Sequence, residues 1–239
     1  TQAISVDPSL AETYINSGNA LCSLDKYERA LQHFDWAITL NPDLAIGHMN
    51  RGTVLQSLHL YEEALTTNDR AIGLNTNLAG AYLNRGNALQ ALYRSEEALD
   101  SYRRAIILNR DFAEAYVNQG NACQRLGYCT RALQSYQAAR ALSPGFAESH
   151  MNMANVLGEM NRHEEAISHY RRAWTLDPDL DDVLSSLVYT QTKVCDWDGF
   201  DYFVEQLIEG VVNKKKAVMP FELLHFTDDP FVNRAASES

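Results

Sequence analysis

Apolar and polar residues follow a helical period along most of the chain, and this pattern itself recurs every 34 residues. Each unit holds two amphipathic runs of about a dozen residues joined by a short polar turn, which predicts two helices per unit. One helix pair cannot bury its apolar faces alone, so the pairs are expected to stack in an all-α fold without strands. Counted with Ala11 as position 1, the units follow without insertion as 11–44, 45–78, 79–112, 113–146 and 147–180.

Small residues recur at fixed positions of the unit, and they indicate that helices cross closely there. Positions 20 and 27 are alanine in all five units. Position 8 is filled by Gly18, Gly52, Gly86, Gly120 and Ala154. Large side chains fill the remaining space: position 4 is Tyr or His, and position 24 is aromatic except at Asn68.

This combination of repeat length, small positions and aromatic positions resembles the tetratricopeptide repeat over residues 11–180. The resemblance implies a right-handed α-solenoid of antiparallel helix-turn-helix repeats, in which the first helices line a concave groove. It also implies a protein-protein interaction domain that binds a protein or peptide ligand in this groove.

The two ends of the chain depart from the full repeat. Ala3–Pro8 matches the closing segment Ala37–Pro42, so residues 1–10 are expected to be the end of a truncated upstream repeat. Residues 181–209 are expected to form a degenerate sixth helix pair that caps the stack, because bulky residues replace the small ones. Residues 210–239 are expected to be a linker towards an absent downstream domain.

Two segments near the C-terminus, Val194–Phe203 and Pro220–Pro230, are not repeat-like. They resemble the connection between repeats and catalytic domain in bacterial relatives of the O-linked N-acetylglucosamine transferase and SPINDLY-type glycosyltransferases. The resemblance implies that this chain is the N-terminal substrate-recognition part of a protein O-glycosyltransferase, and that its own downstream catalytic domain carries the sugar site. The alternative is a stand-alone tetratricopeptide scaffold or adaptor with no enzymatic partner domain. The matching motifs are Cys195-Asp196-Trp197, Pro220-Phe221 and Asp228-Asp229-Pro230.

Composition narrows the classes of partner. The formal net charge is −11, the opposite of what binding to phosphates requires, so no nucleic acid is expected as a partner. The lone basic cluster Lys214–Lys216 is interpreted as a solvated linker. No apolar run is long enough to span a bilayer, so no membrane partner is expected either.

Cysteine and histidine spacing gives no sign of a metal or catalytic site. Cys22, Cys123, Cys129 and Cys195 lack CxxC spacing, which fits a reducing, cytoplasmic location. No histidine pair shows the i, i+4 spacing of helical metal ligands, and no glycine-rich phosphate loop follows a strand. We therefore expect no cofactor, no metal and no catalytic residue in this chain.

A stripe of asparagines runs through the first helices at positions 6 and 9 of the unit. Positions 2, 6, 9 and 13 share one helix face, opposite positions 4, 8 and 11. The stripe consists of Asn16, Asn19, Asn50, Asn84, Asn87, Asn118, Asn121, Asn152 and Asn155, with Thr53 in one place. Nine asparagines in helix interiors cost several kcal/mol relative to alanine, at roughly 0.5–0.7 kcal/mol each, so a compensating interaction is expected.

Two explanations of the stripe compete. In the structural one, each amide bonds to the backbone or to the next repeat, satisfying polar groups between repeats. In the functional one, the amides form a peptide-binding groove, because an amide offers both a donor and an acceptor to a peptide backbone. The functional explanation is preferred for position 6, because the neighbouring apolar residues at position 5 would form the floor of a binding groove. For position 9 the two explanations are given equal weight.

Three further residues, all outside the stripe, are candidates for contacts. Arg51 and Arg85 at position 7 could reach an acidic partner, but a salt bridge at the groove edge is the preferred interpretation. Trp36 replaces the arginine found at position 26 of other units and is expected on the outer surface. It would pack on an upstream repeat or, as the alternative, form a dimer contact; self-association through the truncated N-terminal end is also expected.

Overall fold

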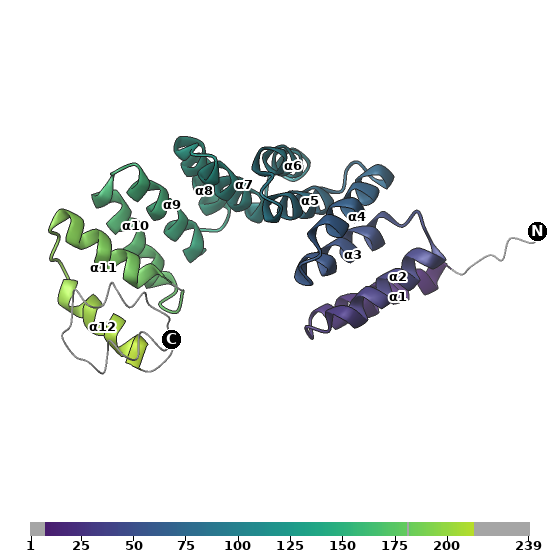
Figure 1. Cartoon of the computed structure of the whole chain (residues 1–239), viewed down its shortest axis with the longest axis horizontal. Helices are drawn as coiled ribbons and strands as arrows, with labels where there is room; N and C mark the ends of the chain where they lie inside the picture. The colour runs from purple at the N-terminus through teal and green to yellow at the C-terminus, as the bar shows by residue number, and fades with distance from the viewer. Residues whose placement is uncertain (1–7, 181, 213–239) are drawn as a thin grey trace, which may run out of the picture. The chain divides into compact units, whose positions relative to one another are not determined.

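The computed structural model describes residues 8–180 and 182–212, and these residues form helices and turns without a strand. The all-α fold class is thereby confirmed. The helices are α1 (Pro8–Cys22), α2 (Tyr27–Leu40), α3 (Ala45–Ser57), α4 (Tyr61–Leu74), α5 (Ala79–Ala91), α6 (Ser95–Leu108), α7 (Ala113–Arg125), α8 (Cys129–Leu142), α9 (Ala147–Glu159), α10 (His163–Leu176), α11 (Val183–Val194) and α12 (Phe200–Val212). Figure 1 shows their order along the chain.

The chain divides into two compact units, residues 1–126 and 127–239. In the first unit, each second helix (α2, α4, α6) packs on the first helix of its own repeat and on that of the next repeat. The first helices α1, α3, α5 and α7 also contact one another in series. They therefore form one continuous layer, and the second helices form another.

The second unit, described by itself, consists of the helices α8 to α12. Each of the helices α8 to α11 packs on the next one along the chain. The pair α11 and α12 lies where the sequence predicts a degenerate sixth pair, and Leu187, Val188 and Leu207 are buried in it.

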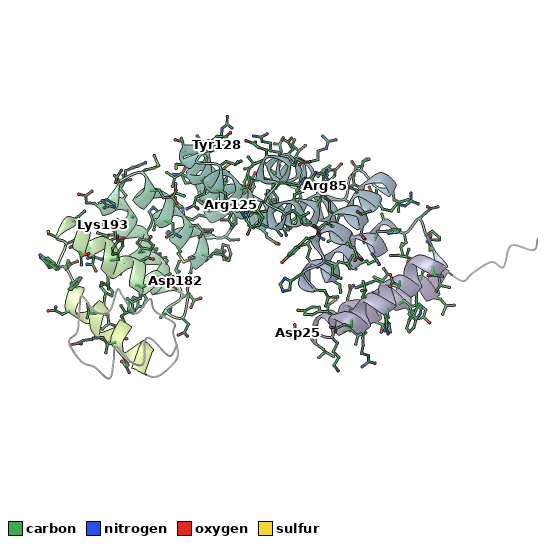
Figure 2. All side chains as sticks on the ribbon, in the orientation of Figure 1. Asp25, Arg85, Arg125, Tyr128, Asp182 and Lys193 are labelled. Carbon is green, nitrogen blue, oxygen red and sulfur yellow. The ribbon has the colours of Figure 1, made fainter. Side chains whose placement is uncertain are left out.

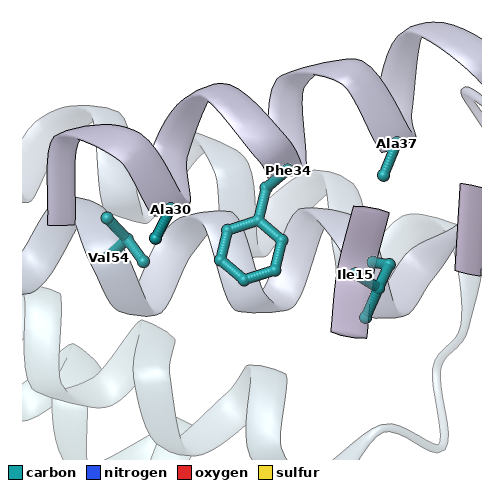
Figure 3. Close-up of a cluster of buried hydrophobic side chains, with 5 residues drawn as sticks. All are labelled: Ile15, Ala30, Phe34, Ala37 and Val54. Carbon is teal, nitrogen blue, oxygen red and sulfur yellow. The ribbon is translucent and has the colours of Figure 1, made fainter. Parts of the chain in front are cut away.

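Close crossings occur at the glycines of position 8, as the sequence predicts. A Cβ atom on Gly18 would lie 2.6 Å from Cε1 of Phe34, and one on Gly86 would overlap the ring of Tyr102. In repeats 1 and 3 the aromatic ring of position 24 thus lies directly over the glycine of position 8. Figure 3 shows Phe34 within one such core, beside the small residues Ala30 and Ala37.

Position 15 takes a left-handed backbone conformation in every repeat. The φ angles are 54° at Asp25, 60° at His59, 61° at Tyr93, 74° at Gly127 and 58° at Asn161. The backbone N–H of the following residue donates a hydrogen bond to the carbonyl five residues earlier, at the end of the first helix. An example is the bond from the Leu60 N–H to the Leu55 carbonyl, at 2.8 Å. This geometry is the Schellman ending, in which glycine is the unstrained residue. Four of the five repeats nevertheless use another residue there.

Several expectations fall outside the part of the chain that the structure describes. They concern residues 1–7 of the upstream repeat, the basic cluster Lys214–Lys216 and the motifs within residues 220–230. The division of the chain into repeats, cap and linker remains a prediction in these segments.

Candidate functional site

The asparagines of positions 6 and 9 bond to one another across neighbouring repeats. Asn50 Nδ2 donates to Asn19 Oδ1 at 2.9 Å, and Asn118 Nδ2 donates to Asn87 Oδ1 at 2.9 Å. Asn84 Nδ2 makes the equivalent bond, at 2.8 Å, to the hydroxyl of Thr53. In each case position 6 of one repeat donates to position 9 of the repeat before it, which is the pairing that the structural explanation requires.

The aromatic residue of position 24 adds a second bond to position 9. The hydroxyl of Tyr102 donates to Asn87 Oδ1 at 3.0 Å, and that of Tyr170 donates to Asn155 Oδ1 at 2.6 Å. Burial raises the pKa of both tyrosines, so each hydroxyl remains a protonated donor. Asn87 Oδ1 therefore accepts two bonds, one from its own repeat and one from the next.

These bonds use only one half of each amide. Within the described residues, the Nδ2 groups of Asn19 and Asn87 and the Oδ1 atoms of Asn50, Asn84 and Asn118 bond to no other group of the chain. None of these atoms is a buried polar atom without a partner, so water reaches them. The stripe thus presents donors at position 9 and acceptors at position 6.

The remaining asparagines of the stripe differ in exposure. Asn16 is exposed and makes no side-chain hydrogen bond within the described part of the chain. Asn121 is half-buried, Asn152 is buried, and both have partners. Asn155 is half-buried below Tyr170. The nine residues are therefore not equivalent as contact sites.

We call the surface formed by positions 2, 5, 6 and 9 of α1, α3, α5 and α7 the first-helix face. One hollow on this face is a pocket of about 520 Å³ between α1 and α3. The lining residues are Glu12, Ile15, Asn16, Asn19, Leu44, Ile46, Met49 and Asn50. They come from the positions that the sequence assigned to a groove, together with the last residue of the first repeat.

The apolar floor at position 5 lies deeper than the sequence suggests. Ile15, Leu83 and Val117 are all buried between helices, whereas Met49 is half-buried. Exposed apolar surface comes instead from Ile46 at position 2, whose side chain is 45% exposed. Accessible apolar surface is therefore concentrated at the α1–α3 pocket.

Arg51 and Arg85 both form salt bridges. Arg51 Nε donates to Asp35 and Arg85 Nε to Asp69, each at 2.7 Å, and both aspartates stand at position 25 of the preceding repeat. Arg85, labelled in Figure 2, also donates from Nη1 to the Ser101 hydroxyl at 2.7 Å. Both arginines thus connect consecutive repeats.

Trp36 is 47% exposed, and its ring rests on two other rings. The centroids of Tyr14 and His33 lie 5.3 Å and 5.0 Å from it. At the same position of the next repeat, Arg70 pairs with Asp43 of the preceding repeat at 3.3 Å. A contact of Trp36 with another repeat or another molecule remains a prediction.

A histidine pair that the sequence did not reveal lies between α9 and α10. Nδ1 of His150 and Nδ1 of His169 are 3.0 Å apart. Burial, followed by repulsion from His169, Arg140 and Arg172, lowers the pKa of His150 to about 4. Burial and Arg140 also lower the pKa of His169, while Glu165 opposes this. The pair is therefore neutral near pH 7, with one ring donating to the other.

The Cys195-Asp196-Trp197 motif has a structural role in the second unit. Arg171 of α10 donates to Asp198 Oδ2 at 2.8 Å and to Asp196 Oδ2 at 3.1 Å. Gln191, fully buried in α11, donates to the Asp198 carbonyl at 3.0 Å. The two aspartates therefore tie the turn between α11 and α12 to the last full repeat.

The described residues hold no group of three or more His, Cys, Asp or Glu side chains placed to bind a metal ion. Across residues 8–180 and 182–212, no helix combines the length and apolarity needed to cross a membrane. All four cysteines are free thiols.

Solved structures with the same fold include several tetratricopeptide proteins. YrrB, described as a TPR protein with an unusual peptide-binding site, is 27% identical and aligns over 70% of this chain and 86% of its own, with a TM-score of 0.58. PilF of Pseudomonas aeruginosa is 16% identical over 97% of this chain and 98% of its own, with a TM-score of 0.75. PilW, a type IV pilus biogenesis factor, is 14% identical over 94% and 97%, with a TM-score of 0.76. The last two likenesses concern the fold alone.

Two comparisons of the sequence complete this result. The search of curated proteins gives no match. Models of the tetratricopeptide repeat match residues 11–44, 83–145 and 147–180, which together make up more than half of the chain. The chain therefore belongs to the tetratricopeptide repeat family.

Proposed function

We propose that this tetratricopeptide scaffold binds an extended segment of a protein partner on its first-helix face. The observation that carries the proposal is the half-used amide stripe. The bonds of Asn50 with Asn19 and of Asn118 with Asn87 each fix two side chains and leave one donor and one acceptor facing water, and the bond of Asn84 with Thr53 leaves the Asn84 acceptor. An extended peptide offers one carbonyl and one N–H per residue, so it matches such a row without requiring a particular side-chain sequence.

Two further observations support this function. The α1–α3 pocket supplies apolar surface, including Ile46, beside the first amide pair, Asn19 and Asn50. The description of YrrB, a relative at 27% identity, also names a peptide-binding site. The amide stripe and the pocket both suit the binding of a peptide.

The test begins with a random decapeptide display library panned against the purified chain. Enriched peptides are then synthesised, and their Kd is measured by fluorescence anisotropy. Asn84→Ala combined with Asn118→Ala removes two outward-facing acceptors, and loss of about one hydrogen bond at each site is expected to weaken binding roughly tenfold or more. The matched control is Thr66→Ala on α4, an exposed residue of the opposite layer. An unchanged Kd in the double variant would contradict the proposal.

A glycosyltransferase connection remains a second, separate hypothesis. It rests on the sequence motifs alone, and none of the solved structures named above is described as a glycosyltransferase. Since Asp196 and Asp198 already have a structural role with Arg171, their presence does not require that connection. Sequencing the gene beyond codon 239 tests it: a nucleotide-sugar transferase domain would support the hypothesis, and a stop codon or an unrelated domain would leave the scaffold.

A further inference from the structure

We infer that the α1–α3 pocket selects a partner segment in which an apolar side chain is flanked by lysine or arginine. This inference rests on the proposed function, since it specifies which peptides the first-helix face prefers. It is carried by three properties of the pocket: its apolar lining, its amide pair and the carboxylate of Glu12 at its edge.

The apolar lining of the pocket comes from both helices and from the turn before α3. Ile15 is 7% exposed, and α3 comes close to it because Gly47 has no side chain: a Cβ there would lie 3.3 Å from Ile15 Cδ1. Leu44, Ile46 and Met49 complete the apolar surface. A volume of about 520 Å³ accepts one large apolar side chain together with adjoining backbone.

The amide pair restricts the occupant to a polypeptide. Asn50 Nδ2 is bonded to Asn19 Oδ1, which leaves Asn19 Nδ2 as a donor and Asn50 Oδ1 as an acceptor at the pocket wall. In an extended chain the N–H and the C=O of one residue point to the same side, so a single residue can bond to both atoms. A purely apolar ligand would leave them without partners and would pay the cost of their desolvation.

The charge at the pocket edge favours a cation. Glu12 is exposed and forms no ion pair with any residue that the structure describes. Arg51, the nearest arginine in the repeat pattern, is already bonded to Asp35 and Thr67. Positions 2, 5, 6 and 9 of α1, α3, α5 and α7 contain no lysine or arginine. A lysine or arginine beside the anchored side chain would neutralise Glu12, whereas an acidic residue would be repelled.

The next gap along the layer lacks this combination. Position 2 of α5 is Gly80, and a Cβ built on it would lie 2.9 Å from the sulfur of Met49. The Met49 thioether thus already covers the α5 backbone, and no carboxylate stands at position 2 of α3 or α5. The preference is therefore expected at repeats 1 and 2.

The experiment uses the decapeptides enriched from the random library. They are expected to share an apolar residue with lysine or arginine within two positions of it. Charge reversal by Glu12→Lys is expected to weaken their binding about tenfold or more, with less effect at high salt. Ile46→Ser, which changes a half-exposed side chain and leaves the core intact, is expected to weaken binding about fivefold.

The matched control is Glu28→Lys, which changes the same residue type in the same repeat at an exposed position of α2, in the layer of second helices. It is expected to alter the Kd less than twofold, within the range of exposed charge effects. Circular dichroism checks that each variant is folded. Peptides that bind with equal Kd to wild type and Glu12→Lys, yet weakly to the Asn84→Ala, Asn118→Ala variant, would overturn this inference and leave the proposed function standing. Enrichment of no peptide above background would overturn both.

Discussion

Asparagine-to-alanine substitutions on one helix face should change stability in opposite directions, according to whether the amide is bonded between repeats. Asn87 is the most connected member of the stripe, since its Oδ1 accepts from Asn118 Nδ2 and from the Tyr102 hydroxyl. Asn16 is exposed and has no such bond within the described residues. Both residues lie in the interior of a first helix, so helix propensity affects them equally.

The expected magnitudes follow from these contacts. Alanine is favoured over asparagine by roughly 0.6 kcal/mol in a helix interior, so Asn16→Ala should raise the free energy of unfolding by about that amount. Asn87→Ala gains the same propensity but loses two hydrogen bonds, each worth about 0.5–1.5 kcal/mol net. The hydroxyl of Tyr102 keeps Gln90 Oε1 as an acceptor at 3.2 Å, which limits the loss. We expect a net destabilisation of about 1 kcal/mol for Asn87→Ala.

Urea denaturation followed by far-ultraviolet circular dichroism measures both variants against wild type. A double-mutant cycle of Asn87→Ala with Asn118→Ala isolates the bond between repeats, with an expected coupling of about 0.5–1 kcal/mol. Equal stabilisation by Asn16→Ala and Asn87→Ala would refute the reasoning, because propensity alone would then decide the outcome.

Three other predictions concern the core, the turns and the histidine pair. Gly86→Ala places a methyl group on the ring of Tyr102, so it should destabilise the protein by about 2 kcal/mol or more in the same urea assay; an effect below about 0.5 kcal/mol would contradict the close crossing. Tyr93 is 83% exposed and has a φ of 61°, so Tyr93→Gly should relieve strain and stabilise by about 1 kcal/mol, while Tyr93→Ala should give less than half of this gain. Because the pKa of His150 falls from 6.5 to about 4 on folding, the unfolded state binds its proton more readily; stability is full above pH 6.5 and is lost as pH falls towards 4. Between pH 7.5 and 5.0 this loss is about 2 kcal/mol. His150→Tyr, which carries the residue found at position 4 of three other repeats, should show about 2 kcal/mol less pH dependence, and an unchanged profile would contradict the role of His150.

The helix pairs could be predicted from the sequence because small and large residues recur at fixed positions of the repeat. A glycine such as Gly86 and a large ring such as Tyr102 have to meet if the two helices of a unit cross, and the structure places them in contact. The same spacing predicts one polar face on the first helices, and the side-chain bonds of Asn50, Asn84 and Asn118 join neighbouring first helices on it. The spacing does not predict whether the Nδ2 donor or the Oδ1 acceptor of each asparagine bonds within the chain. An asparagine offers both groups, and its place in the sequence is the same in either case.

The contacts between repeats were harder to foresee, although the sequence contained a signal for one of them. Aspartate at position 25 and arginine at position 7 of the next repeat occur together as Asp35 with Arg51 and Asp69 with Arg85. Both change together in the following pair, to Arg103 and Gln119. The pairing of His150 with His169, at positions 4 and 23 of one repeat, has a counterpart in the first repeat, where the ring centroids of Tyr14 and His33 lie 5.7 Å apart. Position 23 holds Thr, Ser or His in the five units, so the sequence pattern was too irregular to predict this contact.

The two explanations of the asparagine stripe are compatible once the amide is treated as two groups. The bond between Asn118 and Asn87 satisfies one acceptor and one donor and fixes both side chains in a single orientation. The groups that remain are then held at defined points, so a peptide that bonds to them loses less side-chain entropy than it would on free asparagines. The helix-propensity cost of the stripe is offset by the bonds between repeats. In this proposal, the same bonds that stabilise the stack also prepare its surface for a ligand, and a variant that breaks one of them should weaken both stability and peptide affinity.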